Sequence, residues 1–336
     1  MIATRSIAGF TVPAIGLGCM NLNHAYGQPP SAEEGERLLL TALDLGVTLF
    51  DTAALYGFGQ NETLVGRVLK SHRNRIVLCS KGGMTGQPVG PGGALQRVID
   101  GRPESVLRDC DDSLRRLQTD VIDLYYLHRW DKSVPIEDSV GAMARLVQAG
   151  KVRAIGLSEV SAATLRRAHA VHPIAALQTE YSPWTRNPEL GVLQACKDIG
   201  ATFVAFSPVA RGFLTNVLPD TTALAPQDIR RGMPRFQAPH WEANQALHTQ
   251  AQALARQAGC TLAQLSLAWL LAQGEHVLPI PGTSKLEHLR ENAATAGIAV
   301  PASVLAALSA LVNTQTVSGN RYGAQARGEV DTESFD

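Results

Sequence analysis

The stretch Val121-Ile-Asp-Leu-Tyr-Tyr-Leu-His128 is a β-prone, mostly apolar run that ends on an ionisable side chain. It lacks strict alternation, as expected of a parallel strand that is buried on both faces. Most of seven further short runs share this character, and each of the eight predicts one strand. The eight runs cover residues 14–18, 49–53, 76–81, 121–128, 154–158, 176–180, 202–207 and 277–281.

Helical segments are predicted between these runs. Ser31-Ala-Glu-Glu34 and Thr261-Leu-Ala-Gln264 have the spacing of capping boxes, and Pro103 stands where a first helical residue belongs. Apolar residues recur at helical spacing over 142–148 and 190–199.

Eight strand-then-helix units in one chain predict a closed (β/α)₈ TIM barrel. We expect a single α/β domain over residues 1–336, with the barrel over about 10–312 and a tail over about 313–336. The rival is an open doubly wound sheet, because Gly16-Leu-Gly18 follows a strand like half of a dinucleotide fingerprint. Asn21 stands where the third glycine of that fingerprint would be.

Composition excludes several classes of protein. The chain has 30 basic and 30 acidic residues, a net charge of zero and 45% hydrophobic residues. No basic surface for nucleic acid or anionic membrane is expected. The five cysteines are widely spaced without a CxxC motif, which predicts reduced thiols in a cytoplasmic protein and no metal site. No signal peptide is apparent, and no apolar stretch reaches the roughly 18 residues of a membrane span.

Two segments interrupt the strand–helix rhythm. Residues 211–241 form a long, proline-containing connection after the seventh run, and a lid or substrate loop is one interpretation, a plain surface insertion the other. The polar tail from Asn313 onward is expected to wrap the surface or to fray.

Ionisable side chains stand at the ends of three neighbouring runs. Asp51 ends the second, with Tyr56 five residues later; Lys81 ends the third and His128 the fourth. Active sites of TIM barrels lie at this end of the strands. We therefore expect the four side chains to meet in one pocket.

Their chemistry suits proton transfer to a carbonyl oxygen. A free tyrosine has a pKa near 10, and a neighbouring ammonium stabilises the phenolate and lowers that pKa. Asp51 would keep Lys81 charged, so that Tyr56 acts as a tuned general acid. His128 would polarise the carbonyl by a hydrogen bond, while a cofactor supplies a hydride.

These residues and their surroundings resemble the aldo-keto reductase superfamily, in its bacterial and plant branch. The resemblance runs over about residues 10–310. It is carried by Gly16-Leu-Gly-Cys-Met-Asn21, Phe50-Asp-Thr-Ala-Ala-Leu-Tyr-Gly57, Asn61-Glu-Thr-Leu-Val-Gly66, the run from Ser113 to His128, Gly150-Lys-Val-Arg-Ala-Ile-Gly-Leu-Ser158, Ala205-Phe-Ser-Pro-Val-Ala-Arg-Gly212 and Pro279-Ile-Pro-Gly-Thr-Ser-Lys285. The family's catalytic tetrad then falls on Asp51, Tyr56, Lys81 and His128.

The resemblance also implies NADPH bound at the barrel mouth, with weaker use of NADH possible. Arg211 would pair with the pyrophosphate, and Ser284 with Lys285 would bind the 2′-phosphate at the start of a helix capped by Ser284-Lys-Leu-Glu287. Glu159 departs from the family's usual Asn and His288 from its usual Arg, which weakens these two contacts. The implied cofactor residues are Gly18, Met20, Asp51, Ser158, Glu159, Gln178, Phe206, Ser207, Pro208, Val209, Arg211, Gly212, Gly282, Thr283, Ser284, Lys285, His288, Glu291 and Asn292.

Tyr26, Phe58 and Trp130 are the candidate substrate contacts, and they favour apolar or aromatic aldehydes. The expected partner is a small carbonyl compound; self-association stays open, and neither nucleic acid nor membrane is expected. A channel-associated subunit that keeps the cofactor site, and a lyase that uses Lys81 as a Schiff base, remain as alternatives.

Overall fold

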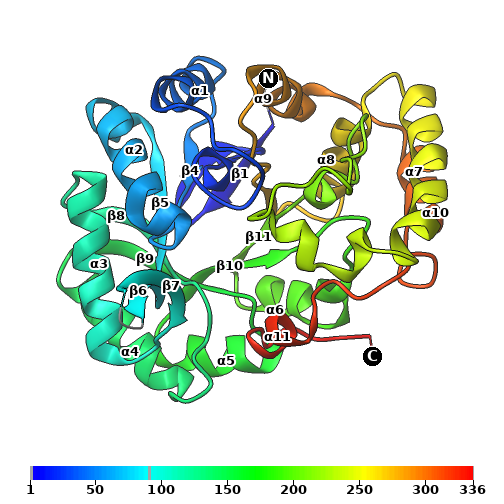
Figure 1. The fold of residues 1–336 in the computed structure, drawn as a ribbon. Coiled ribbons are helices and arrows are strands. Elements are labelled where there is room, and N and C mark those ends of the chain that lie inside the picture. Colours follow the sequence, from blue (N-terminus) through cyan, green and yellow to red (C-terminus); the bar gives the residue numbers. More distant parts are fainter. Residues whose placement is uncertain (1–2, 90–91, 336) are drawn as a thin grey trace.

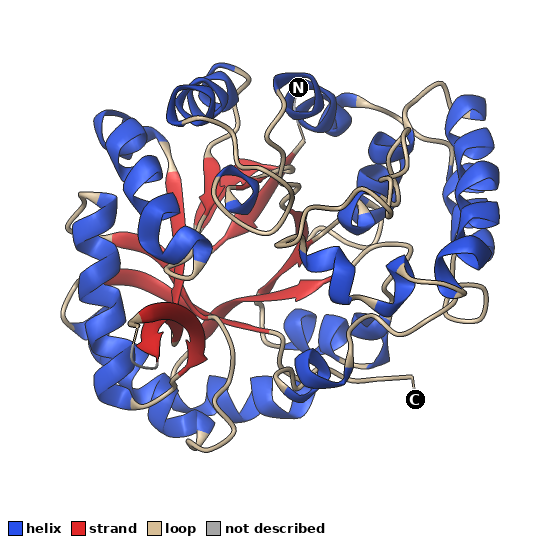
Figure 2. Ribbon diagram, viewed as in Figure 1, coloured by secondary structure: helices blue, strands red, loops and turns tan. Residues whose placement is uncertain are grey.

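The computed structural model describes residues 3–89 and 92–335, and its centre is an eight-stranded parallel sheet (Figures 1 and 2). The strands pair in the order β12-β11-β10-β9-β8-β5-β4-β3. They are β3 (Leu17–Gly18), β4 (Leu49–Asp51), β5 (Val77–Gly82), β8 (Ile122–Leu127), β9 (Val152–Ser158), β10 (Ile174–Glu180), β11 (Thr202–Phe206) and β12 (Val277–Pro279).

A parallel bridge between Gly18 and Gly282 joins the first strand to the segment after the last, and so closes the sheet into a barrel. A Cβ atom on Gly18 would lie 2.9 Å from the carbonyl oxygen of Ile280, so this closure needs a residue without a side chain. The closed order confirms the predicted TIM barrel, and the open doubly wound alternative is wrong.

Helices surround the strands as a ring (Figure 2). The crossover helices are α1 (Ala32–Asp44), α2 (Gln60–Leu69), α3 (Pro103–Leu117), α4 (Ile136–Gln148), α5 (Ala162–Val171), α6 (Val192–Asp198) and α8 (Leu262–Leu271), with α9 (Leu286–Ala294) after β12. Further helices are α7 (His240–Gln257) in the connection to α8, and α10 (Ala302–Leu311) and α11 (Ala324–Gly328) near the C-terminus.

The predicted starts of three helices are confirmed. Ser31 and Thr261 form capping boxes at α1 and α8, and Pro103 opens α3. The predicted capping box at Ser284 is wrong, because α9 begins at Leu286 with Lys285 as its N-cap. The hydroxyl of Thr283 instead accepts a hydrogen bond of 3.0 Å from the Lys285 backbone N–H. The N-cap therefore lies one residue later than the sequence pattern predicts.

Two hairpins lie outside the eight predicted strands. β1 (Thr4–Ile7) and β2 (Phe10–Pro13) pair ahead of the barrel, where Ile7 and Val12 belong to the same buried cluster as strand residues of the interior. β6 (Met84–Val89) and β7 (Ala94–Ile99) pair antiparallel directly after β5. The β6–β7 hairpin therefore stands beside the end of the barrel at which β5 delivers Lys81 (Figure 1).

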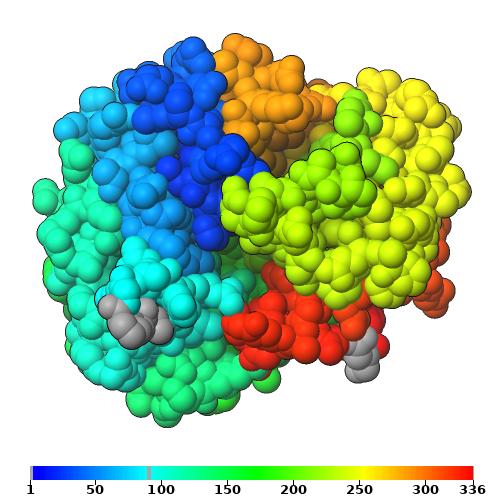
Figure 3. Space-filling view, viewed as in Figure 1, coloured from blue at the N-terminus to red at the C-terminus, as the bar shows by residue number. Residues whose placement is uncertain are grey.

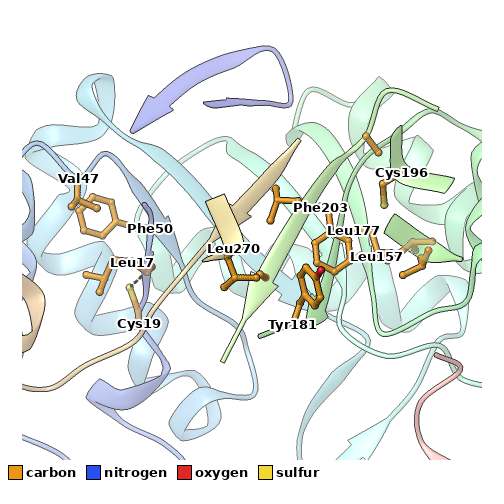
Figure 4. Close-up of a cluster of buried hydrophobic side chains, with 14 of the residues drawn as sticks. Leu17, Cys19, Val47, Phe50, Leu157, Leu177, Tyr181, Cys196, Phe203 and Leu270 are labelled. Carbon is orange, nitrogen blue, oxygen red and sulfur yellow. Dashed lines mark hydrogen bonds between the residues drawn. The ribbon is translucent and has the colours of Figure 1, made fainter. Parts of the chain in front are cut away.

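The core lies between the strands and the helix ring. Figure 4 shows part of it, with Phe50 beside Val47, and with Tyr181 beside Phe203. Burial of strand side chains on both faces explains why the runs read as continuous rather than alternating. All five cysteines are free, and Cys260 alone of them is not fully buried.

The C-terminal tail is packed against the barrel mouth, contrary to the expectation that it merely wraps or frays. Tyr322 is 8% exposed, and its neighbour Arg321 is also buried in its side chain. The Lys132 ammonium holds the carbonyl oxygens of Gly328 and Val330 at 2.9 and 2.8 Å. In Figure 3 the red tail lies between the cyan hairpin and the yellow-green connection, so it forms a wall of the mouth.

Candidate active site

The four predicted catalytic side chains meet at one end of the barrel. Asp51 is the last residue of β4 and Lys81 lies at the end of β5, one residue before its last. His128 directly follows β8. Tyr56 begins a turn in which Gly57, Phe58 and Gly59 all have positive φ, and this turn leads into α2 at Gln60. The left-handed turn thus presents the Tyr56 ring over the strand ends.

The contacts of Lys81 join three members of the tetrad. Its ammonium lies 2.5 Å from Asp51 Oδ1, 2.9 Å from the Thr52 carbonyl oxygen and 3.2 Å from Tyr56 Oη. Asp51 Oδ2 accepts a hydrogen bond of 2.8 Å from the Gln178 side chain. Lys81 is 1% exposed, so this ion pair is sealed beneath the tyrosine.

Burial and charge act in opposite directions on these groups. Burial is the largest single cause and lowers the pKa of Lys81, but Asp51 and Tyr56 together raise it more, so the pKa lies above its ordinary value and the ammonium stays charged. For Tyr56 burial is the largest cause and raises the pKa, while Lys81 lowers it less. The expected net lowering of the tyrosine pKa is therefore wrong for the free protein, because desolvation outweighs an ammonium whose charge Asp51 already compensates.

The imidazole of His128 is neutral. Burial lowers its pKa well below the ordinary value, and the neighbouring cation of Arg129 lowers it further. The ring lies edge-on to Tyr56, with 5.8 Å between the two ring centroids. A neutral imidazole keeps one N–H, so His128 can donate a hydrogen bond to a ligand oxygen beside the tyrosine hydroxyl.

A cavity of about 1140 Å³ opens above the tetrad and runs to the N-terminus of α9. Asp51, Tyr56 and His128 line one end of it, while Lys81 lies below. Nearly all the cofactor residues implied by the resemblance also line it. These are Gly18, Met20, Ser158, Gln178, Phe206, Ser207, Pro208, Val209, Arg211, Gly212, Gly282, Thr283, Ser284, Lys285, His288, Glu291 and Asn292.

Glu159 is the exception among the implied cofactor residues. Its carboxylate pairs with Arg321 of the tail and accepts the Glu180 backbone N–H at 2.9 Å. The side chain is 1% exposed and does not reach the cavity in the described part of the chain. Glu159 is thus a buried anchor for the tail, and the expected contact to a carboxamide by its side chain is not supported.

Arg211 lines the cavity, but its charge is already paired. Its Nη2 lies 2.6 Å from Glu180 Oε2, and the same guanidinium donates to the hydroxyls of Tyr26 and Tyr322, each at 3.2 Å. Burial raises the pKa of Glu180, yet Arg211 and Arg321 more than offset this and leave it lowered. The guanidinium therefore neutralises a buried carboxylate, and its pairing with a pyrophosphate stays a prediction.

The three substrate candidates lie in different places. Tyr26 lines the main cavity. Phe58 packs over Gly86 of the β6–β7 hairpin and lines a separate cavity of about 390 Å³. Trp130 donates its indole N–H to the Val134 carbonyl oxygen, and neither it nor Phe58 is among the described residues around the main cavity. Among the described residues, Tyr26 alone of the three therefore lines the cavity into which the tetrad opens.

Several cavity residues were not predicted. His24 stacks on the Tyr56 ring at 5.9 Å, Met84 and Arg97 come from the unpredicted hairpin, and Arg129 follows His128. Arg129 could have been found, since it directly follows a predicted catalytic residue at a strand end. Arg97 could not, because its position depends on the hairpin and on Glu329 of the tail, which pairs with it at 2.5 Å.

The connection after β11 crosses the cavity. The Ile229 backbone N–H donates to the Ala25 carbonyl oxygen at 3.0 Å, and the Gln227 side chain reaches the Gly27 carbonyl oxygen at 3.1 Å. These bonds join the connection to the loop after β3, as the contact of yellow-green and dark blue surfaces in Figure 3 shows. The interpretation of 211–241 as a cover over the site is supported, and that of a plain surface insertion is not.

Within the described residues, no group of three or more histidine, cysteine, aspartate or glutamate side chains could hold a metal ion. Each helix within residues 3–89 and 92–335 is too short or too polar to span a bilayer.

A (β/α)₈ barrel with an Asp–Lys–Tyr contact and a neutral histidine around one long cavity defines a class of barrel enzyme. The sequence model of the Aldo/keto reductase family matches residues 14–313. The chain belongs to this family, which confirms the resemblance inferred from its motifs.

Relatives and solved structures agree with this membership. The chain is 42% identical to an aldo-keto reductase of Schizosaccharomyces pombe named for NADP(+), over 98% of each chain. It is 40% identical to probable aldo-keto reductase 1 of Glycine max, over 94% of this chain and 89% of that one. Among structures, a glycerol dehydrogenase from Gluconobacter oxydans matches with a TM-score of 0.84, 28% identity and coverage of 94% and 97%. An aldo-keto reductase from Klebsiella pneumoniae in complex with NADPH matches with a TM-score of 0.72, 29% identity and coverage of 96% and 99%.

Proposed function

We propose that the protein is an NADP(H)-dependent reductase of aldehydes and ketones, with Tyr56 as the general acid. The observation that carries this proposal is that the tetrad and a phosphate-type site open into the same cavity of about 1140 Å³. This volume exceeds the range of roughly 300–1,000 Å³ that holds a drug-sized ligand. It leaves room for a dinucleotide together with a small substrate.

The donors around the cavity fit such a cofactor. Ser158 and Gln178 lie at the tetrad end, where a carboxamide needs a donor and an acceptor. Ser284 and Lys285 are exposed at the N-terminus of α9, where backbone N–H groups and the helix dipole favour a phosphate. The solved Klebsiella pneumoniae relative is described in complex with NADPH. When bound, NADPH would supply the hydride that the protein's own side chains lack.

The side chains of the tetrad then divide the proton chemistry. The N–H of neutral His128 would orient and polarise the substrate carbonyl. As negative charge develops on that oxygen, the Tyr56 hydroxyl would donate its proton to it. Lys81, 3.2 Å from the tyrosine oxygen, would stabilise the resulting phenolate, and Asp51 keeps Lys81 charged and in place. The raised pKa of Tyr56 keeps the acid protonated until a substrate accepts its proton.

The same ion pair argues against the lyase alternative. A Schiff-base lysine must be neutral to attack a carbonyl, whereas Asp51 raises the pKa of Lys81 above its ordinary value. We also propose a cytoplasmic location, since all five cysteines are free thiols in the described residues.

The proposal is tested by mixing the protein with NADPH and a panel of aliphatic and aromatic aldehydes. We expect loss of cofactor absorbance with several aldehydes, and quenching or enhancement of NADPH fluorescence on binding. Absence of oxidation with every aldehyde, together with absence of NADPH binding, would refute it. NADPH binding without turnover would favour the alternative of a cofactor-holding binding protein.

A further inference from the structure

The cations around the cavity differ in whether a carboxylate balances them. Lys81 is paired with Asp51, Arg97 with Glu329, Arg211 with Glu180 and Arg230 with Asp228. Arg231 lies exposed on the connection after β11 and donates to the Leu224 carbonyl oxygen. Arg129 has no carboxylate partner among residues 3–89 and 92–335, although it directly follows the catalytic histidine.

Arg129 is held by one of its three nitrogens. Its Nη1 donates to the His128 carbonyl oxygen at 2.7 Å and to Ser158 Oγ at 3.1 Å. These two bonds fix the half-buried guanidinium beside the tetrad. No further bond of Arg129 is found in the described residues, so the N–H of Nε and the two of Nη2 have no protein acceptor. The edge of the guanidinium that carries Nε and Nη2 can bind a carboxylate by two parallel hydrogen bonds.

The position of Arg129 argues against a cofactor phosphate as its partner. The phosphate-type site lies after β12, and the segment that lines the cavity next to it follows β11. Arg129 follows β8, and in the sheet order β9 and β10 separate β8 from β11. Arg129 therefore lines the cavity beside His128, at the end where the tetrad lies. Its charge reaches the reacting groups, since it lowers the pKa of His128 and offsets a small part of the rise in the pKa of Tyr56.

Building on the carbonyl reduction proposed above, we propose that Arg129 selects carbonyl substrates that carry a carboxylate close to the reacting carbonyl. A planar guanidinium edge binds a carboxylate by two parallel hydrogen bonds, and Arg129 lies away from the phosphate-type site, so the substrate would supply that carboxylate. The other carboxylates near this end, Asp51 and Glu329, are each already bound to a cation, so they do not cancel the attraction. The preferred substrates are therefore anionic, whereas the candidate substrate contacts in the sequence favour apolar or aromatic aldehydes.

The test compares each acid with its own neutral ester. The pairs are 3-carboxybenzaldehyde, 4-carboxybenzaldehyde and succinic semialdehyde, each against its methyl ester, with NADPH in excess. We expect kcat/KM for at least one acid to exceed that of its ester by tenfold or more, mainly through a lower KM. In Arg129→Gln this acid-to-ester ratio should fall to about two or below, and Arg129→Lys should restore part of it.

Matched controls separate the possible failures. Arg145→Gln removes an exposed arginine from the outer surface of α4 and should leave the acid-to-ester ratio of the wild type unchanged. Esters that are reduced as well as or better than every acid would overturn the inference while leaving carbonyl reduction intact. An Arg129→Gln variant that binds NADPH more weakly but keeps its acid-to-ester ratio would also overturn it, since Arg129 would then serve the cofactor. Failure of all six compounds would instead count against the proposed function.

Discussion

Two clusters of buried charged residues lie at the mouth of this barrel. They differ in how far apart in the sequence their paired residues are. The tetrad takes Asp51, Tyr56, Lys81 and His128 from neighbouring strands, and its lysine and aspartate are 30 residues apart. The second cluster, which we name the mouth clamp, consists of Glu159, Glu180, Arg211 and Arg321. Its pair Arg321–Glu159 joins residues 162 apart.

The two clusters have different roles. The tetrad leaves a tyrosine hydroxyl and an imidazole facing the cavity, whereas the mouth clamp satisfies its charges internally. Glu159 and Glu180 bind arginines of the tail and of the connection after β11, the two segments that enclose the cavity. The comparison indicates that buried charges can build either a reactive site or a structural ion-pair cluster, depending on whether proton-bearing groups face the cavity.

The largest effect on turnover should come from removing the general acid of the tetrad, Tyr56. Tyr56→Phe removes the proton donor while keeping the ring, and we expect turnover to fall by about 10²- to 10⁴-fold. NADPH affinity, measured by fluorescence titration, should change little. Tyr181→Phe is the matched control, because its hydroxyl is bound to Glu189 away from the cavity. Comparable turnover in Tyr56→Phe and wild type would show that another group donates the proton.

Breaking the mouth clamp should lower the free energy of unfolding more than it lowers turnover. Arg321→Met leaves the carboxylate of Glu159 buried without its cation, and we expect unfolding free energy to fall by about 3–5 kcal/mol in urea titrations. Glu159→Gln combined with Arg321→Met should recover part of this loss. Arg166→Met breaks an exposed pair with Asp198 and should cost about 1 kcal/mol or less. Equal losses in the buried and the exposed variant would contradict the assignment of a mouth clamp.

A smaller effect is expected at the far end of the cavity. Lys285→Ala should raise the Kd for NADPH by about five- to tenfold and that for NADH by less than twofold, because only NADPH carries the 2′-phosphate. Equilibrium titration with both cofactors measures the difference. Lys197→Ala, on the outer face of α6, should change neither. If both Kd values rise alike in Lys285→Ala, the lysine does not contact the 2′-phosphate.

Changing the pH should have the smallest effect on the reductive kcat/KM. Tyr56 must be protonated to act as an acid, and its pKa is raised above the ordinary value near 10, so activity should be lost only above that value. His128 must be neutral, and its pKa is lowered well below about 6.5, so it stays neutral above that value. Reductive kcat/KM should therefore be nearly flat from about pH 6.5 to 9.5. A steep limb inside this window would show that one pKa is shifted in the opposite direction.

The sequence by itself determined the barrel and the tetrad. The eight strands were predicted to within a few residues, since doubly buried strands must be continuous apolar runs. The ionisable ends of those runs had to meet, because parallel strands carry their ends to one side of a barrel. Arg129 was within reach of the same reasoning, as it stands directly after His128.

Tertiary structure alone decided how the mouth is closed and how its charges are paired. Nothing near Glu159 in the sequence points to Arg321, because a buried pair depends on where the tail packs. Arg211 resembles a phosphate ligand in its motif, yet Glu180 takes its charge in the folded chain. The pKa of Tyr56 likewise depends on the depth of its burial, which outweighs Lys81. Local patterns fix strands and helix starts, whereas desolvation and long-range pairing are properties of the whole fold.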